Sequence, residues 1–314
     1  MQFASHPPGV SWSARLLANV LIPDLNCPER PTFHRDIFVE LAKSEATAAA
    51  VRRALRAQSH PTRIAGATRF FKCGPGEYGE GDTFIGVTVP AQRTIARLFR
   101  DLPLGETDKL LTSRIHEERS TALLILVDRF NRGDERMRGQ IFRLYMRRLR
   151  FINNWDLVDS SAAPIVGGWL QDKPRPSTLL RAAPSEVEGR GLLDRLARSK
   201  HLWSRRAAMI ATFYYIYRGE HRDAIRIATI LVHDSHDLIH KAVGWMLREV
   251  DKRASPTALT AFLNRHAATM PRTMLRYAIE RLPAAERKVW MGRATTVTKS
   301  WPQRSQRSQR NKFS

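Results

Sequence analysis

The stretch "HEERSTALLILVDRF", residues 116–130, places apolar residues at helical spacing behind a charged start. This pattern predicts an amphipathic α-helix. Four later segments share the apolar helical period, and each is bounded by a helix-capping or helix-breaking residue. They are "NWDLVDSSAAPIVGGWL" (154–170), "LWSRRAAMIATFYYIYRG" (202–219), "DLIHKAVGWMLREV" (237–250) and "MPRTMLRYAIERL" (270–282). One helical unit therefore recurs along the chain.

The spacing of these segments decides the fold class. Measured between His116, Trp155, Trp203, Asp237 and Met270, the steps are 39, 48, 34 and 33 residues. Helical segments that recur every 33 to 47 residues or so are typical of the stacked helix pairs of HEAT and armadillo solenoids. Sustained strand alternation is missing from the sequence. We therefore predict an all-α fold, an α-solenoid of HEAT-like repeats with a concave basic groove.

The regions around the repeats divide the chain into an arm, a repeat domain and a tail. A helical pattern rich in Ala, Leu and Arg starts at Arg35, and we expect the repeat domain to cover residues 35–292. Residues 1–34 are rich in Pro, Ser and Asn and predict a flexible arm. The repeated QRS triplet predicts a disordered basic tail over residues 293–314.

Two stretches inside the repeat domain are expected to be loops. Residues 72–90 hold most of the local glycine, and their "GPGEYGEGD" fits neither known phosphate-binding glycine pattern. Residues 171–191, "QDKPRPSTLLRAAPSEVEGRG", look like an inserted loop. Such an insertion explains why one step between repeats is 48 residues long.

The charge of the chain points to a polyanionic partner. Its 314 residues include 52 Lys and Arg against 30 Asp and Glu, a formal net charge of +22. Nucleic acid is the first candidate for such a partner, ahead of an anionic membrane surface. A membrane span is not expected, since no apolar run approaches about 18 residues. The two cysteines, Cys27 and Cys73, make neither a disulfide framework nor a metal-binding spacing.

Polar and aromatic residues recur once per repeat where a plain core helix does not need them. They are Trp155 and Asp159, then Trp203, Arg205 and Arg206, then His240, Lys241 and Trp245, and finally Arg272, Thr273 and Arg276. Basic residues in such a series would follow a phosphate backbone, and the aromatic ones would contact a base or a sugar. The alternative is that the arginines are solvated and the tryptophans belong to the core.

Asp159 is the residue that a phosphate-binding surface does not explain, because a carboxylate repels phosphate. Asn154 suits the N-cap of a helix and Asp156 its first turn, where the helix dipole favours an anion. Asp159 lies one turn further on, on the same helical face as Trp155. A carboxylate there would stabilise positive charge, such as the oxocarbenium-like sugar formed when a glycosidic bond breaks.

A histidine cluster is the only other candidate for chemistry. His233, His236 and His240 are spaced three and four residues apart, as metal ligands on one helical face would be. The segment before Asp237 has the character of a turn, however, with Asp234 and Ser235 as candidate caps. We therefore expect no metal site.

The ordered motifs resemble those of the AlkD-type DNA alkylation repair proteins, which are HEAT-like-repeat DNA glycosylases. The resemblance covers residues 35–292 and includes "FFKCGPGEYGEGDTFIGV" (70–87) together with the five helical segments quoted above. The family signature is an aromatic residue and an aspartate on one repeat, an arginine on the next and a tryptophan on the one after. Here these positions fall on Trp155, Asp159, Arg206 and Trp245, with Arg205 as the second choice for the arginine.

The resemblance implies hydrolysis of the N-glycosidic bond of N3- and N7-alkylated purines in duplex DNA, without a cofactor. Asp159 would stabilise the sugar cation and position water, and the two tryptophans would bracket the lesion nucleotide. Arg206 would hold the adjacent phosphate. The remaining basic stripe predicts DNA-binding residues at Arg205, Lys241, Arg272, Thr273 and Arg276.

Two other functions stay open at this point. One is a non-catalytic HEAT-repeat protein that recognises damaged or branched DNA, and the other is a scaffold for an acidic protein. The complete signature set favours the enzyme. We expect a soluble, monomeric, cytoplasmic protein that associates with a bacterial-type nucleoid.

Overall fold

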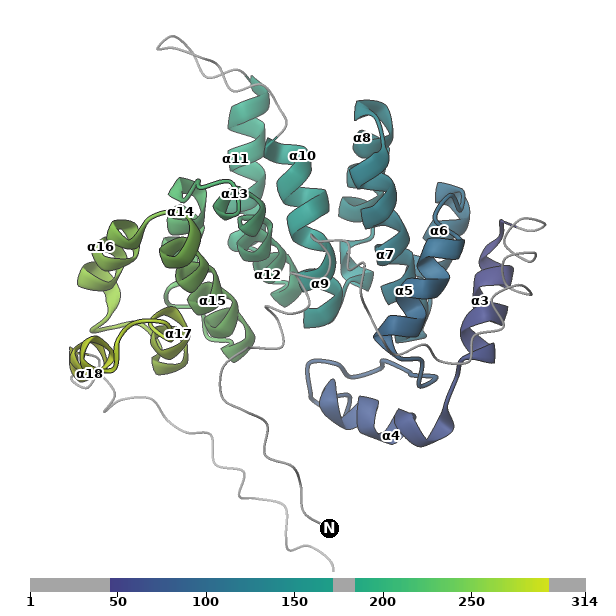
Figure 1. The fold of residues 1–314 in the computed structure, drawn as a ribbon, viewed down its shortest axis with the longest axis horizontal. Coiled ribbons are helices and arrows are strands. Elements are labelled where there is room, and N and C mark those ends of the chain that lie inside the picture. Colours follow the sequence, from purple (N-terminus) through teal and green to yellow (C-terminus); the bar gives the residue numbers. More distant parts are fainter. Residues whose placement is uncertain (1–45, 172–183, 294–314) are drawn as a thin grey trace, which may run out of the picture.

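The computed structural model describes residues 46–171 and 184–293, with side chains from residue 191 onward in the second range. These residues form an arch of helices that runs from α3 to α18 (Figure 1). The expected arm, the tail beyond Arg293 and part of the expected inserted loop lie outside the described residues. Within the described part, helices account for the regular structure and the only β-type pairing is an isolated bridge. The prediction of an all-α repeat fold is confirmed.

An inner row of helices forms the continuous spine of the arch. Each of its members packs against the next. The row consists of α5 (Val89–Leu98), α7 (His116–Arg132), α9 (Trp155–Ala162), α12 (Leu202–Ala211), α15 (Asp237–Arg253) and α17 (Arg272–Ala278). The repeated segments of the sequence are these helices: His116, Trp155 and Asp237 are the first residues of α7, α9 and α15.

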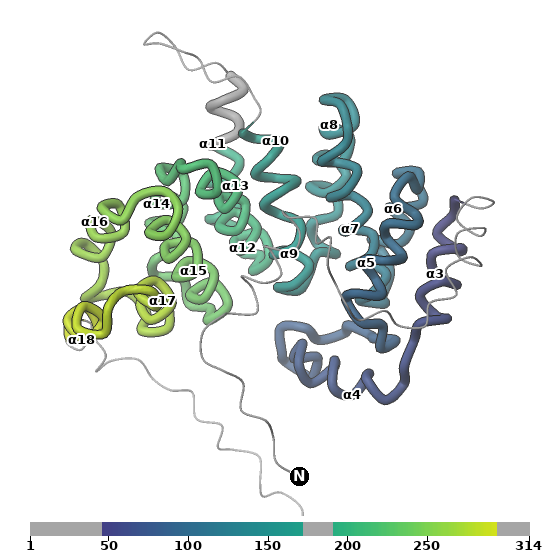
Figure 2. Tube along the Cα trace, in the orientation of Figure 1, coloured from purple at the N-terminus to yellow at the C-terminus, as the bar shows by residue number. Residues whose placement is uncertain are grey.

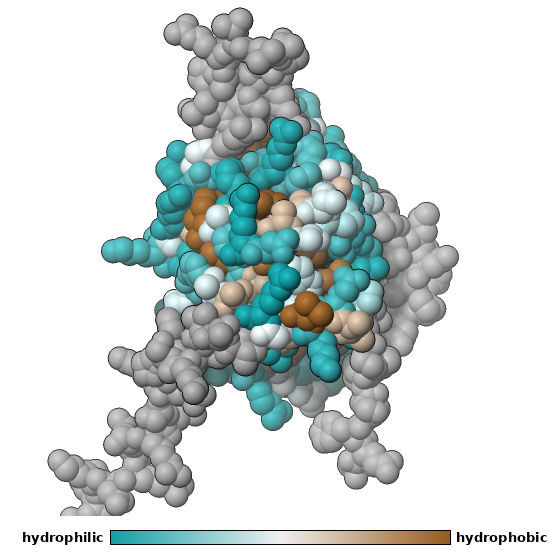
Figure 3. Space-filling view, turned by 90° about the vertical axis from the view of Figure 1, so that its left-hand side faces the viewer, coloured by the Kyte–Doolittle hydropathy of each residue, from teal (hydrophilic) through white to brown (hydrophobic). Residues whose placement is uncertain are grey.

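An outer row packs on the spine and buries the apolar core between the two layers. It includes α8 (Glu135–Arg147), α11 (Pro184–Ala197), α14 (Arg222–Leu231) and α16 (Pro256–His266). The remaining elements of the arch are α3 (Ala48–Ala57), α6 (Leu104–Leu111), α10 (Gly168–Gln171), α13 (Phe213–Ile216), α18 (Ala284–Arg293) and the 3₁₀ turn η1 (Leu149–Phe151). Its C-terminal end presents mainly hydrophilic side chains, as the end of a solenoid must (Figure 3).

The structure corrects the expected loop at residues 171–191. Helix α11 begins at Pro184, so the last third of that stretch is helical. Proline at the first position of a helix is favoured, because its missing N–H would have no partner there. A second departure follows α9, where Ala163–Gly167 form a π-helical turn, η2. It contains Pro164, which cannot donate the hydrogen bond that an α-helix would require at that position.

Helix α4 (Pro61–Phe70) and the loop of residues 71–88 lie beneath the arch, against the starts of the inner helices (Figures 1 and 2). The predicted loop at 72–90 is confirmed up to Thr88, after which α5 begins. An isolated bridge pairs Thr83 with Ile115, and the His116 N–H donates to the Thr83 carbonyl oxygen at 2.8 Å. These bonds fix the loop to the first turn of α7. No described helix has the length and apolar character that a membrane span needs.

The packing of α15 on α17 depends on one glycine. A Cβ added at Gly244 would overlap the Met274 carbonyl oxygen and the Tyr277 side chain. Because backbone cannot give way as a flexible side chain does, only glycine allows these two helices to approach so closely.

We predict that Gly244→Ala lowers the free energy of unfolding by about 1–3 kcal/mol, since α15 and α17 must separate to admit the methyl group. Urea denaturation followed by circular dichroism measures this. The control is Gly66→Ala in α4, where an added Cβ meets nothing within 4 Å. That control should be neutral or stabilising, because alanine is the better helix former. Equal stability of both variants would contradict the packing account.

Candidate active site

The candidate site is built where the first two turns of α9, α12 and α15 meet. Arg206 of α12 donates from Nε and Nη2 to the two carboxylate oxygens of Asp159 on α9, at 2.8 and 2.7 Å. Its Nη1 donates to the Leu238 carbonyl oxygen of α15. Asp159 is 0% exposed and Arg206 is 4% exposed. One guanidinium therefore ties three consecutive inner helices together.

The burial of this ion pair sets the electrostatics of the site. Burial raises the pKa of Asp159, and the attraction and hydrogen bonds of the Arg206 guanidinium oppose that rise. A two-pronged arginine–carboxylate bond requires the ionised form of the acid. The structure thus holds a desolvated carboxylate whose charge is balanced by a single cation.

Trp155 is covered by the segment beneath the arch. Its ring stacks on Phe71, with centroids 5.6 Å apart and an interplanar angle of 27°, and meets Phe70 edge-on at 5.8 Å. Trp155 is half-buried, whereas Phe70 is exposed. The stack continues from Phe71 to His116, whose ring centroid is 4.8 Å away. Sequence reasoning missed this aromatic cover.

Trp245 has a different environment from the one expected for a lesion-facing residue. It is 3% exposed, and its ring lies 6.2 Å from that of Phe213 within the α13–α15 contact. Its indole Nε1 is buried and has no hydrogen-bond partner among the described residues. A buried indole N–H usually finds an acceptor, so this atom marks a polar position that the protein itself leaves unsatisfied.

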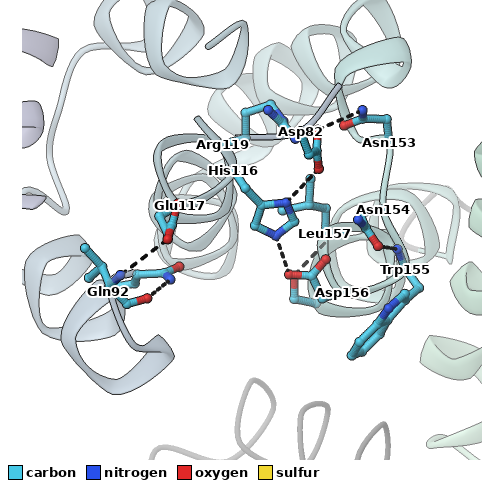
Figure 4. Close-up of polar contacts among 12 residues, drawn as sticks. Asp82, Gln92, His116, Glu117, Arg119, Asn153, Asn154, Trp155, Asp156 and Leu157 are labelled. Atoms are coloured by element: carbon cyan, nitrogen blue, oxygen red, sulfur yellow. Dashed lines mark hydrogen bonds and ion pairs between the residues drawn. The ribbon is translucent and has the colours of Figure 1, made fainter. Parts of the chain in front are cut away.

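A second buried network joins the loop beneath the arch to α7 and α9 (Figure 4). His116 places Nδ1 2.9 Å from Asp82 and Nε2 2.8 Å from Asp156. Arg119 donates to the other oxygen of Asp82 at 2.6 Å, and Asn153 also bonds to Asp82. Figure 4 shows the Trp155 indole projecting from the start of α9 on the side away from this network.

The two carboxylates make His116 a cation. Burial alone disfavours the charged imidazole, but the attraction and hydrogen bonds of Asp156 and Asp82 outweigh it and raise the pKa of His116 to about 9. Burial alone would raise the pKa of the Asp82 carboxyl, but the hydrogen bonds and charges of His116 and Arg119 outweigh it and lower that pKa. His116 is therefore protonated at neutral pH and binds the loop to the start of α9.

Glu117 fixes the rest of the same loop. Its carboxylate accepts backbone N–H groups from Ile85, Gly86 and Val87, at distances from 2.8 to 3.3 Å. Gln92 adds a bond to the Val87 carbonyl oxygen at 2.8 Å. The sequence signal for this function was present, since "HEER" puts adjacent charged residues at the start of an apolar helix. Nothing local showed that they would bind residues 82–87, more than 29 positions away.

The predicted DNA-binding residues divide into two groups. Arg205 is mostly buried and bonds to Asp234 at 2.6 Å, while Arg272 donates to the Met291 carbonyl oxygen. Both therefore brace neighbouring helices in this structure. The others reach the surface: Arg276 is exposed, whereas Thr273 and Lys241 are half-buried, and Lys241 pairs with an aspartate one turn away.

The histidine cluster has a structural function. His236 is the N-cap of α15 and accepts the Leu238 N–H at 3.1 Å through Nδ1, so the cap falls neither on Asp234 nor on Ser235 as expected. The ring of His240 bonds to the Asp234 carbonyl oxygen. Among the described residues, no group of three or more candidate ligands is placed to hold a metal ion.

The raised pKa of His116 predicts a pH-dependent stability. The folded pKa lies above the ordinary value of 6.5, so the stabilisation is fully present below about pH 6.5 and is lost as pH rises through about 9. We predict that the parent loses on the order of 3 kcal/mol of unfolding free energy over this range. His116→Gln should give a flatter curve, and His221→Gln, at the uncapped start of α14, should follow the parent. Parallel curves for all three proteins would show that the charge of His116 does not stabilise the fold.

Comparisons with known proteins identify the family of this chain and agree with its helical fold. The family model described as "DNA alkylation repair enzyme" matches residues 51–282. A solved structure, a predicted DNA alkylation repair enzyme from Enterococcus faecalis, is similar in fold, with a TM-score of 0.54 and 14% sequence identity. The match covers 72% of this chain and 98% of that one. A search of curated proteins finds no match. The chain belongs to the DNA alkylation repair enzyme family, which assigns it a role in DNA repair.

Proposed function

We propose that this protein is a DNA glycosylase that hydrolyses the N-glycosidic bond of N3- and N7-alkylated purines in duplex DNA. The observation that carries the proposal is the desolvated Asp159 carboxylate held by Arg206 beside Trp155. A buried charge is costly. A site that must stabilise a developing cation does need a pre-oriented anion.

The chemistry requires little from the protein beyond this anion. Alkylation at N3 or N7 makes the purine cationic, so it leaves with the bonding electrons and needs no general acid. The deoxyribose carries the positive charge that develops as the bond breaks. The Asp159 carboxylate stabilises that charge and orients a water molecule, whose oxygen bonds to C1′ while a proton is released. The products are free base and an abasic site.

The aromatic and basic residues hold the lesion nucleotide in this mechanism. Trp155 presents its ring to the sugar and, by cation–π attraction, to the charged base. Trp245 contributes a second indole, which is buried against Phe213 in this structure and must become exposed when DNA binds. Because Asp159 is wholly covered, the Asp159–Arg206 pair has to separate when DNA binds beneath the arch, and Arg206 then donates a hydrogen bond to the neighbouring phosphate.

The enzyme is expected to be monofunctional. A lyase reaction needs an amine that attacks C1′, and Lys241, the lysine nearest to this set in the sequence, is paired with Asp237 at 2.6 Å. Duplex DNA with an alkylated purine is the partner, and the surface cations Lys241 and Arg276 add phosphate contacts. The mechanism uses no cofactor.

The direct test is base release from a duplex oligonucleotide with one 7-methylguanine, under single-turnover conditions. We predict release by the parent and a loss of at least a hundredfold in Asp159→Asn, with DNA binding retained. Asp128→Asn is the matched control, since Asp128 lies at the surface of α7 and pairs with the partly exposed Arg100 and Arg132. Circular dichroism and thermal melting check that each variant is folded.

The outcomes separate the enzyme from the second candidate, a non-catalytic protein that binds damaged or branched DNA. If the parent releases neither 7-methylguanine nor 3-methyladenine but binds DNA in a salt-sensitive way, the binding function replaces the enzyme. If Asp159→Asn releases base as fast as the parent, Asp159 is not the catalytic carboxylate.

A further inference from the structure

Helix α8 carries a row of cations on its exposed side. Arg136, Gln140, Arg143 and Arg147 follow one another at four, three and four residues, which places them on one face of the helix. The three arginines are exposed, and the row extends over about 16 Å at the rise of an α-helix. We call these four residues the α8 row.

A groove runs beside the α8 row. It has a volume of about 600 Å³ and lies between α8 and the start of α6, over the second half of α7. Leu104, Met137 and Leu144 form its apolar part, while Arg129, Arg143 and Arg147 supply cations. No aromatic side chain is among the described residues that line the groove.

Acidic residues do not neutralise this surface. Asp108, the carboxylate in the groove, accepts two bonds of 2.7 Å from Arg148 and lies 3.8 Å from Arg147. Among residues whose side chains the structure describes, no carboxylate lies within ion-pair distance of Arg136 or Arg143. The three arginines of the α8 row therefore have only one carboxylate near them, Asp108, and Arg148 already bonds to both of its oxygens. Such an excess of guanidinium groups favours the binding of an external anion.

This surface is separate from the candidate active site. His116, at the start of α7, binds the loop that covers Trp155. Arg129, which lines the groove, is thirteen residues later on the same helix, so Arg129 and His116 lie about 20 Å apart along α7. In Figure 1, α8 stands at the opposite side of the arch from α4 and the segment that covers Trp155. A duplex bound beneath the arch at Trp155 therefore leaves the α8 row free.

We propose that the α8 row and its groove bind the phosphate backbone of a second duplex DNA segment. Guanidinium groups match phosphate oxygens through paired hydrogen bonds, and a straight row of them suits a stiff, rod-like polyanion. Single-stranded nucleic acid is bound through aromatic stacking platforms, and this groove has none among its lining residues. The protein thus holds one DNA segment at the arch, where the proposed function places it, and another at α8.

The test measures the binding of a short undamaged duplex, so it does not depend on base release. We compare the parent with Arg136→Gln/Arg143→Gln/Arg147→Gln, which keeps the length and helix preference of each side chain. The charge-matched control is Arg56→Gln/Arg97→Gln/Arg265→Gln, which removes three exposed arginines scattered over α3, α5 and α16. Fluorescence anisotropy over a range of salt gives affinity and salt slope, and titration above the dissociation constant gives stoichiometry.

We expect the parent and the scattered control to bind two duplexes per chain and the α8 variant to bind one. For the duplex bound at α8, the three arginines should contribute about 2 to 3 to the slope of log K against log salt, at about 0.9 for each neutralised phosphate, and this contribution should be missing from the α8 variant. If the arch binds no DNA, the parent binds one duplex and the α8 variant none, which upholds the α8 site and refutes the proposed function. An α8 variant with the slope and stoichiometry of the control overturns the proposal, and a slope equally reduced in both does so as well.

Discussion

The buried pair between Asp159 and Arg206 is the interaction on which the structure depends most. It joins α9 to α12, and the third guanidinium bond reaches the Leu238 carbonyl oxygen of α15. Removing either partner would leave an uncompensated charge in a dry environment, at a cost of about 3–5 kcal/mol. The packing of three successive repeats and the electrostatics of the candidate site therefore rest on the same atoms.

A second buried network gives the site its cover. His116 is held as a cation by Asp82 and Asp156, and Glu117 holds the backbone of residues 85–87. Together these bonds hold the loop beneath the arch against the first turn of α9, where Phe71 stacks on Trp155. The charged start of α7 is thus not a solvated helix end. It explains why the glycine-rich loop carries Asp82, whereas Glu77 and Glu80 accept the backbone N–H groups of Gly74 and Gly76 within the loop.

The sequence predicted five of the six inner helices, from α7 to α17, because each places apolar residues at helical spacing, and Asn154 also marked the cap of α9. It also placed Asp159 and Arg206 on neighbouring repeats. The sequence could not predict the partners of His116 or the cover on Trp155, because contacts between a loop and a distant helix leave no periodic pattern. The π turn at Pro164 and the helical start at Pro184 escape any prediction that treats proline only as a helix breaker.

A double-mutant cycle on the rate of base release would show whether Asp159 and Arg206 act as one catalytic unit. Single-turnover release from a 7-methylguanine duplex would be compared for the parent, Asp159→Asn, Arg206→Gln and the double variant. Residues that act together are strongly non-additive. We predict that the double variant is no slower than Asp159→Asn alone. Losses that simply multiply, or a parent that releases no base, would contradict it.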